Sequence, residues 1–138
     1  MKKRVPLSQI MSKNLVTVSP NQTLYEADEL FTKHGIRHIP VTEGDKLLGV
    51  ISKSDILRIS YSELADDEES VESLLFDAYT IPQVMTKTPV TLNSEDTVRE
   101  AAELFSRMSF HSIPVVDGTK LVGMVTTTDL IDYLLEQY

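Results

Sequence analysis

Residues 39–55 read I-P-V-T-E-G-D-K-L-L-G-V-I-S-K-S-D, and a near-copy, I-P-V-V-D-G-T-K-L-V-G-M-V-T-T-T-D, occupies residues 113–129. A constant offset of 74 positions separates the two stretches. Each contains two short apolar runs around a polar patch with a glycine, which predicts a β-hairpin with a tight turn. The hairpin leads directly into an apolar pattern with helical spacing. The duplicated unit is therefore a hairpin followed by a helix.

The duplication extends well beyond the hairpin, because residues 9–57 and 83–131 align without a gap and share 19 identities in 49 pairs. Within each copy, a helical turn and a brief β-like run precede a helix that opens with a capping box. Each copy is therefore predicted to read short strand, helix, strand, strand, helix, which gives an α/β (α+β) fold class. The β-like runs are Val16–Val18 and Val90–Leu92, and the capping boxes pair Thr23 with Glu26 and Thr97 with Glu100.

The repeats divide the chain into three parts. A length of 138 residues suits one compact domain, so each repeat is predicted to be half of a single body. We expect repeat 1 over residues 7–60, a connector over residues 61–80 and repeat 2 over residues 81–138. The connector pattern is typical of an exposed acidic loop that leads into an amphipathic helix. Its acidic residues are Glu63, Asp66, Asp67, Glu68, Glu69 and Glu72, and its apolar residues are Val71, Leu74, Leu75 and Ala78.

The composition is that of a soluble globular protein and argues against several classes. The chain is 41% hydrophobic and 25% charged, contains no cysteine and lacks an apolar run of about 18 residues that could span a membrane. No signal-peptide pattern opens the sequence, and the lack of cysteine fits a reducing compartment, so we expect a cytoplasmic protein. The net charge of −8 argues against nucleic acid as a partner, since only Lys2-Lys3-Arg4 clusters positive charge.

Each hairpin is followed by a hydroxyl residue, two spacers and an aspartate, which are Ser52 to Asp55 in repeat 1 and Thr126 to Asp129 in repeat 2. Such spacing before an apolar run predicts a capping box at a helix start. The free N–H groups and the positive dipole end of the same helix can also bind an anionic ligand. The two interpretations use the same atoms, and the pattern alone leaves both open.

The sequence offers no motif typical of an enzyme or a metal site. His34 and His38 have the spacing of two zinc ligands on a helix, but Gly35 and the strand that follows interrupt that helix. Neither a phosphate loop of the G-x-x-x-x-G-K type nor a glycine-flanked nucleophile occurs. We therefore expect no metal site, no catalytic residue and no required cofactor.

Taken together, five short motifs resemble a pair of CBS domains, the arrangement called a Bateman module. The motifs, each present twice in this order, are M-[ST]-K, V-T-[VL], T-x-x-E-A, I-P-V and G-x-[IV]-[ST]-x-x-D. The resemblance covers Leu7 to about Leu135, and small stand-alone CBS-pair proteins and the CBS portion of acetoin-utilisation (AcuB-like) proteins are similar. It implies two repeats packed about a pseudo-twofold axis and assembled as a homodimer.

In that family, two clefts hold adenosine-containing ligands such as AMP, ADP, ATP or S-adenosylmethionine. The resemblance implies that Asp55 and Asp129 accept hydrogen bonds from ribose hydroxyls, for which a carboxylate is suited. It also implies phosphate contacts near each helix start and a base that is flanked by the other repeat. The implied phosphate contacts are Ser52, Ser54, Thr126 and Thr128; Thr17 and Ile39 flank the base above Asp129, and Thr91 and Ile113 flank the base above Asp55.

Arg37 and His38 match the position of basic phosphate contacts in the family, and their counterparts in repeat 2 are His111 and Ser112. Arginine stays charged and binds phosphate bidentately, whereas histidine is mostly neutral at pH 7. If each basic residue serves its own repeat, the Asp55 cleft is predicted to bind nucleotide more tightly. If both reach a shared central region, Arg37 serves both clefts alike.

Two functional hypotheses follow. The first is a regulatory module that binds an adenine nucleotide, without catalysis, and signals to an unidentified regulated protein. The second is a structural or interaction module with empty clefts, since every implied ligand residue also has a cap or turn explanation.

Overall fold

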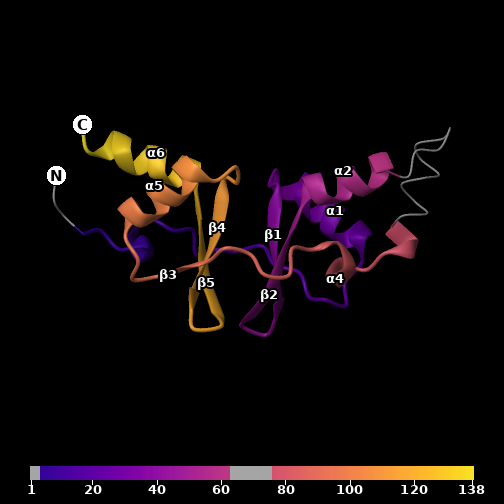
Figure 1. Ribbon diagram of the computed structural model, residues 1–138. Helices are drawn as coiled ribbons and strands as arrows, with labels where there is room; N and C mark the ends of the chain where they lie inside the picture. The colour runs from indigo at the N-terminus through magenta and orange to yellow at the C-terminus, as the bar shows by residue number, and fades with distance from the viewer. Residues whose placement is uncertain (1–3, 63–75) are drawn as a thin grey trace. The chain divides into compact units, whose positions relative to one another are not determined.

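The computed structural model of the protein describes residues 4–62, without the side chains of residues 59–62, and residues 76–138 (Figure 1). The chain forms two compact units, and each takes most of its residues from one repeat. The first-repeat unit comprises residues 16–44 and 48–88, and the second-repeat unit comprises the segment up to Leu15, residues 45–47 and residues 89–138. The predicted acidic cluster of residues 63–72, the apolar positions 71, 74 and 75, and the basic residues Lys2 and Lys3 lie outside the described residues.

The first-repeat unit contains the predicted helix, hairpin and helix in that order. Its elements are α1 (Leu24–His34), β1 (His38–Glu43), β2 (Lys46–Ser52, of which Lys46 and Leu47 belong to the second-repeat unit), α2 (Lys53–Ser62) and α4 (Ile81–Val84). The capping box that begins α1 is confirmed, because the Thr23 side chain accepts a hydrogen bond from the Glu26 N–H at 3.1 Å and the Thr23 N–H donates to Glu26 Oε1 at 3.3 Å. Gly35, with a left-handed φ of 61°, ends the helix as predicted.

The β-like run predicted at Val16–Val18 forms no strand. Only Val18 pairs with β1, through a single bridge to Val41. Pro20 has no N–H with which to continue the ladder, and this explains the short pairing. Ser94 stands at the equivalent position of repeat 2, where a two-residue strand does form.

The second-repeat unit is built around a mixed arrangement of three strands. Its elements are η1 (Leu7–Gln9), β3 (Leu92–Asn93), α5 (Val98–Arg107), β4 (Ser112–Asp117), β5 (Lys120–Thr126) and α6 (Thr127–Glu136). β4 and β5 are antiparallel with a bulge beside Val115 and Val116, and β3 runs parallel to β4. α5 and α6 pack against each other, and α6 packs on β5 (Figure 1).

Both hairpins turn on two residues of which the first is glycine. The loops are Gly44-Asp45 and Gly118-Thr119, with φ values of 59° and 66° at the two glycines. Among the described residues, only glycines have a positive φ, so the second loop residue has a negative one. That combination is the type II′ turn, whose twist matches the flanking strands.

Each unit is completed by the helical turn that begins the other repeat in the sequence. Leu7 of η1 is fully buried in the core of the second-repeat unit, and its counterpart Ile81 of α4 is fully buried in the core of the first-repeat unit. The core around Leu7 contains Ala101, Ile113, Val115 and Val125; the core around Ile81 contains Val18, Leu24, Ala27, Phe31, Ile39, Val41, Ile51, Ile56, Phe76 and Val84. A packing unit thus combines chain segments from both sides of the repeat boundary.

A glycine lets the incoming segment cross β2 closely. Val50 and Thr86 exchange two backbone hydrogen bonds, of 3.1 and 2.9 Å, directly beside Gly49. A Cβ on Gly49 would lie 2.5 Å from the Thr86 carbonyl oxygen and 2.7 Å from the Met85 sulfur. No side chain fits at this position, which explains the glycine of the G-x-[IV]-[ST]-x-x-D motif.

The same crossing occurs on β5. Ser12 and Met124 exchange backbone hydrogen bonds of 2.8 and 3.0 Å beside Gly123. A Cβ on Gly123 would lie 2.5 Å from the Met11 sulfur and 3.0 Å from the Ser12 carbonyl oxygen. The M-[ST] motif and the glycine motif are therefore the two sides of one contact, made once in each unit.

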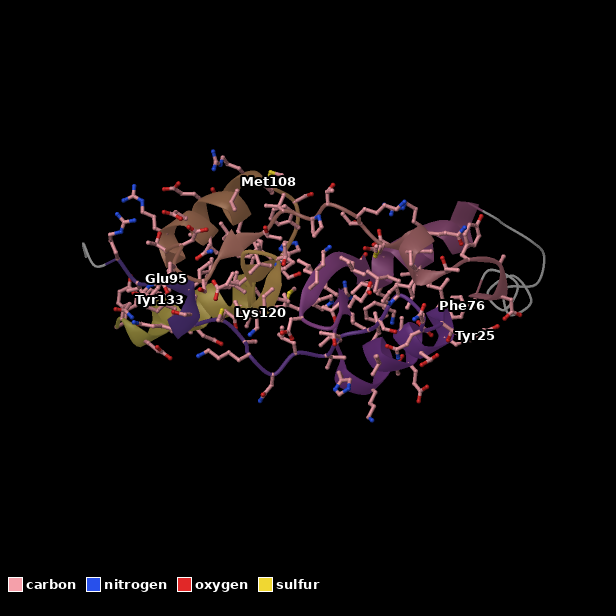
Figure 2. All side chains as sticks on the ribbon, turned by 90° about the horizontal axis from the view of Figure 1, so that it is seen from below. Tyr25, Phe76, Glu95, Met108, Lys120 and Tyr133 are labelled. Atoms are coloured by element: carbon pink, nitrogen blue, oxygen red, sulfur yellow. The ribbon has the colours of Figure 1, made fainter. Side chains whose placement is uncertain are left out.

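One aromatic contact is specific to the first-repeat unit. The Tyr25 and Phe76 rings meet edge to face with centroids 4.8 Å apart, where residues 76–78 are helical (Figure 2). Phe76 is 6% exposed and covers the α1 side of that core. Across the described residues, the helices are too short or too polar to cross a membrane.

We predict that Gly49→Ala lowers the free energy of unfolding by about 2 kcal/mol, within the usual cost of overpacking, because the new methyl group meets a backbone carbonyl. Gly123→Ala is predicted to cost less, since the atom nearest to its new methyl group belongs to the flexible Met11 side chain. Urea unfolding of the two variants, which serve as matched controls for each other, measures the difference. Equal losses, or a larger loss at Gly123, would contradict the crossing geometry.

Candidate ligand sites at two helix starts

The first corner is the point where β2 ends at Ser52 and α2 begins. The Ser52 N–H donates to Asp55 Oδ2 at 3.1 Å, and the Asp55 N–H donates to Ser52 Oγ at 3.1 Å. The predicted capping box is therefore present, and both residues are buried. Ser54 is exposed, and its Oγ lies 3.1 Å from Ser52 Oγ. The corner gathers two hydroxyls, a carboxylate and the N–H groups of a helix start.

The second corner, at the junction of β5 and α6, has the same hydrogen-bonding pattern. The Thr126 N–H donates to Asp129 Oδ2 at 2.9 Å, and the Asp129 N–H donates to Thr126 Oγ1 at 3.1 Å. Both residues are half-buried, and Thr128 is exposed. This corner is more open to solvent than the first.

A backbone hydrogen bond connects each corner to the residue that precedes its hairpin. The Lys53 N–H donates to the Arg37 carbonyl at 2.9 Å, and the Thr127 N–H donates to the His111 carbonyl at 3.0 Å. Arg37 and His111 are both exposed. Arg37 is thus held beside the helix start of its own repeat, which supports the alternative in which it serves the Asp55 site.

Arg58 is a residue that sequence reasoning missed. Its Nη2 donates to Asp55 Oδ1 at 2.5 Å from one turn further along α2, and its side chain is 74% exposed while that of Asp55 is 10% exposed. An arginine three residues after an acid on a helix is a recognisable signal for such a pair. The counterpart of Arg58 is Asp132 on α6, so the second corner has no equivalent cation at this position.

The other predicted site residues differ in exposure. Ile39 and Ile113 are fully buried in the cores of their own units, which leaves only their backbone for a ligand. Thr17 and Thr91 are exposed, and His38 is half-buried. Thr17 and Ile39 belong to the first-repeat unit, whereas their predicted partner Asp129 belongs to the second-repeat unit. Thr91 and Ile113 belong to the second-repeat unit, and their predicted partner Asp55 belongs to the first-repeat unit. Their combination into shared clefts stays a prediction.

The corners can bind a ligand through hydrogen bonds. In residues 4–62 and 76–138, no three histidine or carboxylate side chains are grouped so as to hold a metal ion. Each aspartate uses one oxygen for the cap and retains lone pairs that can accept from hydroxyl groups. The hydroxyl groups can donate to an anion, and the positive end of the helix dipole lies beside them.

The fold and the repeated corners define a pair of CBS domains. The CBS-domain family model matches residues 7–62 and 81–136, so the chain belongs to the CBS-domain family, as predicted. A CBS domain-containing protein of Dictyostelium discoideum is 31% identical over 137 residues, which are 96% of this chain and 93% of that protein.

Solved structures confirm the CBS-pair fold. The CBS domain pair of protein MJ0100, in complex with 5′-methylthioadenosine and S-adenosyl-L-methionine, matches with a TM-score of 0.77 and 27% identity, over 99% of this chain and 100% of that chain. A putative acetoin utilization protein (AcuB) of Vibrio cholerae matches with a TM-score of 0.81 and 24% identity, over 98% of this chain and 93% of that chain. Both matches extend over nearly the whole of this chain.

Some relatives are much longer than this chain. The inosine-5′-monophosphate dehydrogenase of Korarchaeum cryptofilum is 30% identical over 119 residues, which are 86% of this chain but 22% of that protein. The likeness therefore concerns one part of that dehydrogenase.

Proposed function

We propose that the protein is a regulatory module that binds an adenosine-containing ligand at its two corners and signals the bound state to another protein. The observation that carries the proposal is the duplicated corner, in which a capped aspartate adjoins hydroxyls and a helix start. A ribose diol donates to the aspartate, and a phosphate accepts from the hydroxyls at the positive end of the helix dipole. The ligand class comprises AMP, ADP, ATP and S-adenosylmethionine, and the adenosyl ligands of the MJ0100 domain pair support this class.

The proposed mechanism is differential binding without catalysis. A ligand shifts the module between arrangements only by the difference in its affinity for them. We propose that the module acts in the cytoplasm on an unidentified regulated protein and uses neither a cofactor nor a metal.

A structural or interaction module with empty sites is the second candidate function. One observation favours it: the polar groups of the first corner satisfy one another, and Arg58 already neutralises Asp55. Such a corner is stable without a ligand. Thermal unfolding with and without ligand separates the two candidate functions. A ligand that binds the folded protein raises the midpoint of unfolding, and a module with empty sites shows no such rise.

We predict that AMP or S-adenosylmethionine at about 100 times its dissociation constant stabilises the protein by about 2.7 kcal/mol and raises the melting midpoint by several degrees. The double variant Asp55→Ala/Asp129→Ala is expected to stay folded, at a cost of about 1 kcal/mol per cap, but to lose this response. Glu26→Ala is the matched control, since it removes a capping carboxylate from α1 and leaves both corners intact. An unchanged response in the double variant would remove the proposed ribose contacts, and no response in the unaltered protein would favour the second candidate.

We also propose that the protein is a homodimer that buries the outer face of α6. Ile131, Leu134 and Leu135 lie three and four residues apart on this helix and are 57%, 56% and 66% exposed. Residues at this spacing share one helix face, and an exposed apolar stripe is typical of an interaction surface. The CBS-pair resemblance supports a second copy of the chain as the partner.

We predict a dimer mass in light scattering at micromolar concentration and a monomer mass for the double variant Ile131→Asp/Leu135→Asp. A charge placed in an apolar interface is left without a partner and disfavours association. Gln137→Asp, at an exposed polar position beside the end of the same helix, is the control and is expected to remain dimeric. A monomeric unaltered protein would contradict the proposed assembly.

A further inference from the structure

Building on the proposed function, we propose that the two corners select adenosine ligands that differ in charge. The first corner is assigned to a phosphorylated ligand such as AMP, and the second corner is assigned to an uncharged or cationic adenosyl ligand. The Arg58–Asp55 ion pair and the side chains around each corner carry this assignment. The corners share one hydrogen-bonding pattern, so a difference in preference must come from these neighbours.

Three basic positions around the first corner lose their charge or reverse it in the second. Arg37, which is hydrogen-bonded through its carbonyl to the helix start, becomes His111. Lys53, the first residue of α2, becomes Thr127, and Arg58 becomes Asp132. Lys33 in the last turn of α1 corresponds to Arg107 in the last turn of α5, so that position adds positive charge to both units alike.

Arg58 makes the first corner sensitive to the charge of its ligand. Its guanidinium occupies Asp55 Oδ1, which a ribose hydroxyl also needs. A neutral nucleoside must therefore compete with Arg58 and offers no new partner for the displaced cation. A nucleotide offers a phosphate in exchange, and Arg58 lies four residues after the proposed phosphate contact Ser54, on the same face of α2. The exchange favours phosphorylated ligands.

The second corner has the opposite character. Asp129 Oδ2 accepts from Thr126, and no arginine or lysine of the described chain forms an ion pair with Asp129. Asp132, three residues further along α6, brings a second negative charge to the same face of the helix. Two nearby carboxylates repel a phosphate and attract a cation such as the sulfonium and ammonium groups of S-adenosylmethionine.

Calorimetric titration of AMP, adenosine and S-adenosylmethionine into two single variants isolates the corners. Asp129→Ala leaves the first corner intact, and there AMP is expected to bind about tenfold more tightly than adenosine, the effect of one charge-assisted contact. Asp55→Ala leaves the second corner intact, and there AMP is expected to bind no more tightly than adenosine, and S-adenosylmethionine more tightly than AMP. Equal ratios at both corners, or the reverse order, would overturn the assignment.

Charge-reversal variants test the named residues. Added to Asp129→Ala, Arg58→Asp is expected to lower the AMP to adenosine affinity ratio about twofold to fivefold, a modest effect because an exposed charge is screened by solvent. Added to Asp55→Ala, Asp132→Arg is expected to raise the same ratio. The matched control is Arg99→Ala, which removes an exposed arginine that is ion-paired with Glu103 at 3.0 Å on α5 and is expected to leave the ratios unchanged.

The outcomes separate this inference from the proposed function. If none of the three ligands binds the unaltered protein, the proposed function and the charge assignment both fail. If the ligands bind but Arg58→Asp changes AMP and adenosine affinity equally, the proposed function stands and the charge assignment fails. If Arg58→Asp changes the AMP to adenosine affinity ratio, and this change becomes smaller as salt is added, the preference for AMP is electrostatic in origin.

Discussion

The close crossing of two chain segments at Gly49 and at Gly123 is the contact on which the rest of the structure depends. At each crossing, two backbone hydrogen bonds join an M-[ST] segment to the second strand of a hairpin. The helical turn just before that segment then delivers Leu7 or Ile81 to the core beneath. The same strand continues to the corner where the aspartate caps the next helix. Core, hairpin and candidate site are thus connected through one position that tolerates no side chain.

The capped corners show how one set of atoms can serve both folding and binding. The aspartate and the hydroxyl satisfy two backbone N–H groups at the helix start, and this stabilises the helix in the absence of any ligand. The cap also fixes the carboxylate in place, so a ligand that uses its remaining lone pairs meets an ordered acceptor. Preorganisation of this kind lowers the entropic cost of binding.

The local elements could be predicted from the sequence because their signals are local. Gly35 ends α1, Thr23 and Thr126 begin helices, and glycines turn both hairpins, since each of these features depends on residues a few positions apart. The sequence alone could not assign η1 to the second-repeat unit, because a short apolar turn carries no information about which hairpin it packs on. The spacing of Asp55 and Arg58 is compatible with an ion pair, but whether the pair forms depends on one side-chain conformation, and Arg58 lies outside the shared motifs.

The central claim is that the two corners are the places where an adenosyl ligand binds. An amide NMR titration with AMP and with S-adenosylmethionine tests it most directly, because each backbone N–H of the corners reports separately. The expected result is saturable shifts of the amides of Ser52–Asp55 and Thr126–Asp129. AMP is expected to shift the amides of Ser52–Asp55 at the lower concentration, and S-adenosylmethionine those of Thr126–Asp129. Saturable shifts that leave both corners unchanged, or no shifts at millimolar ligand, would contradict the claim.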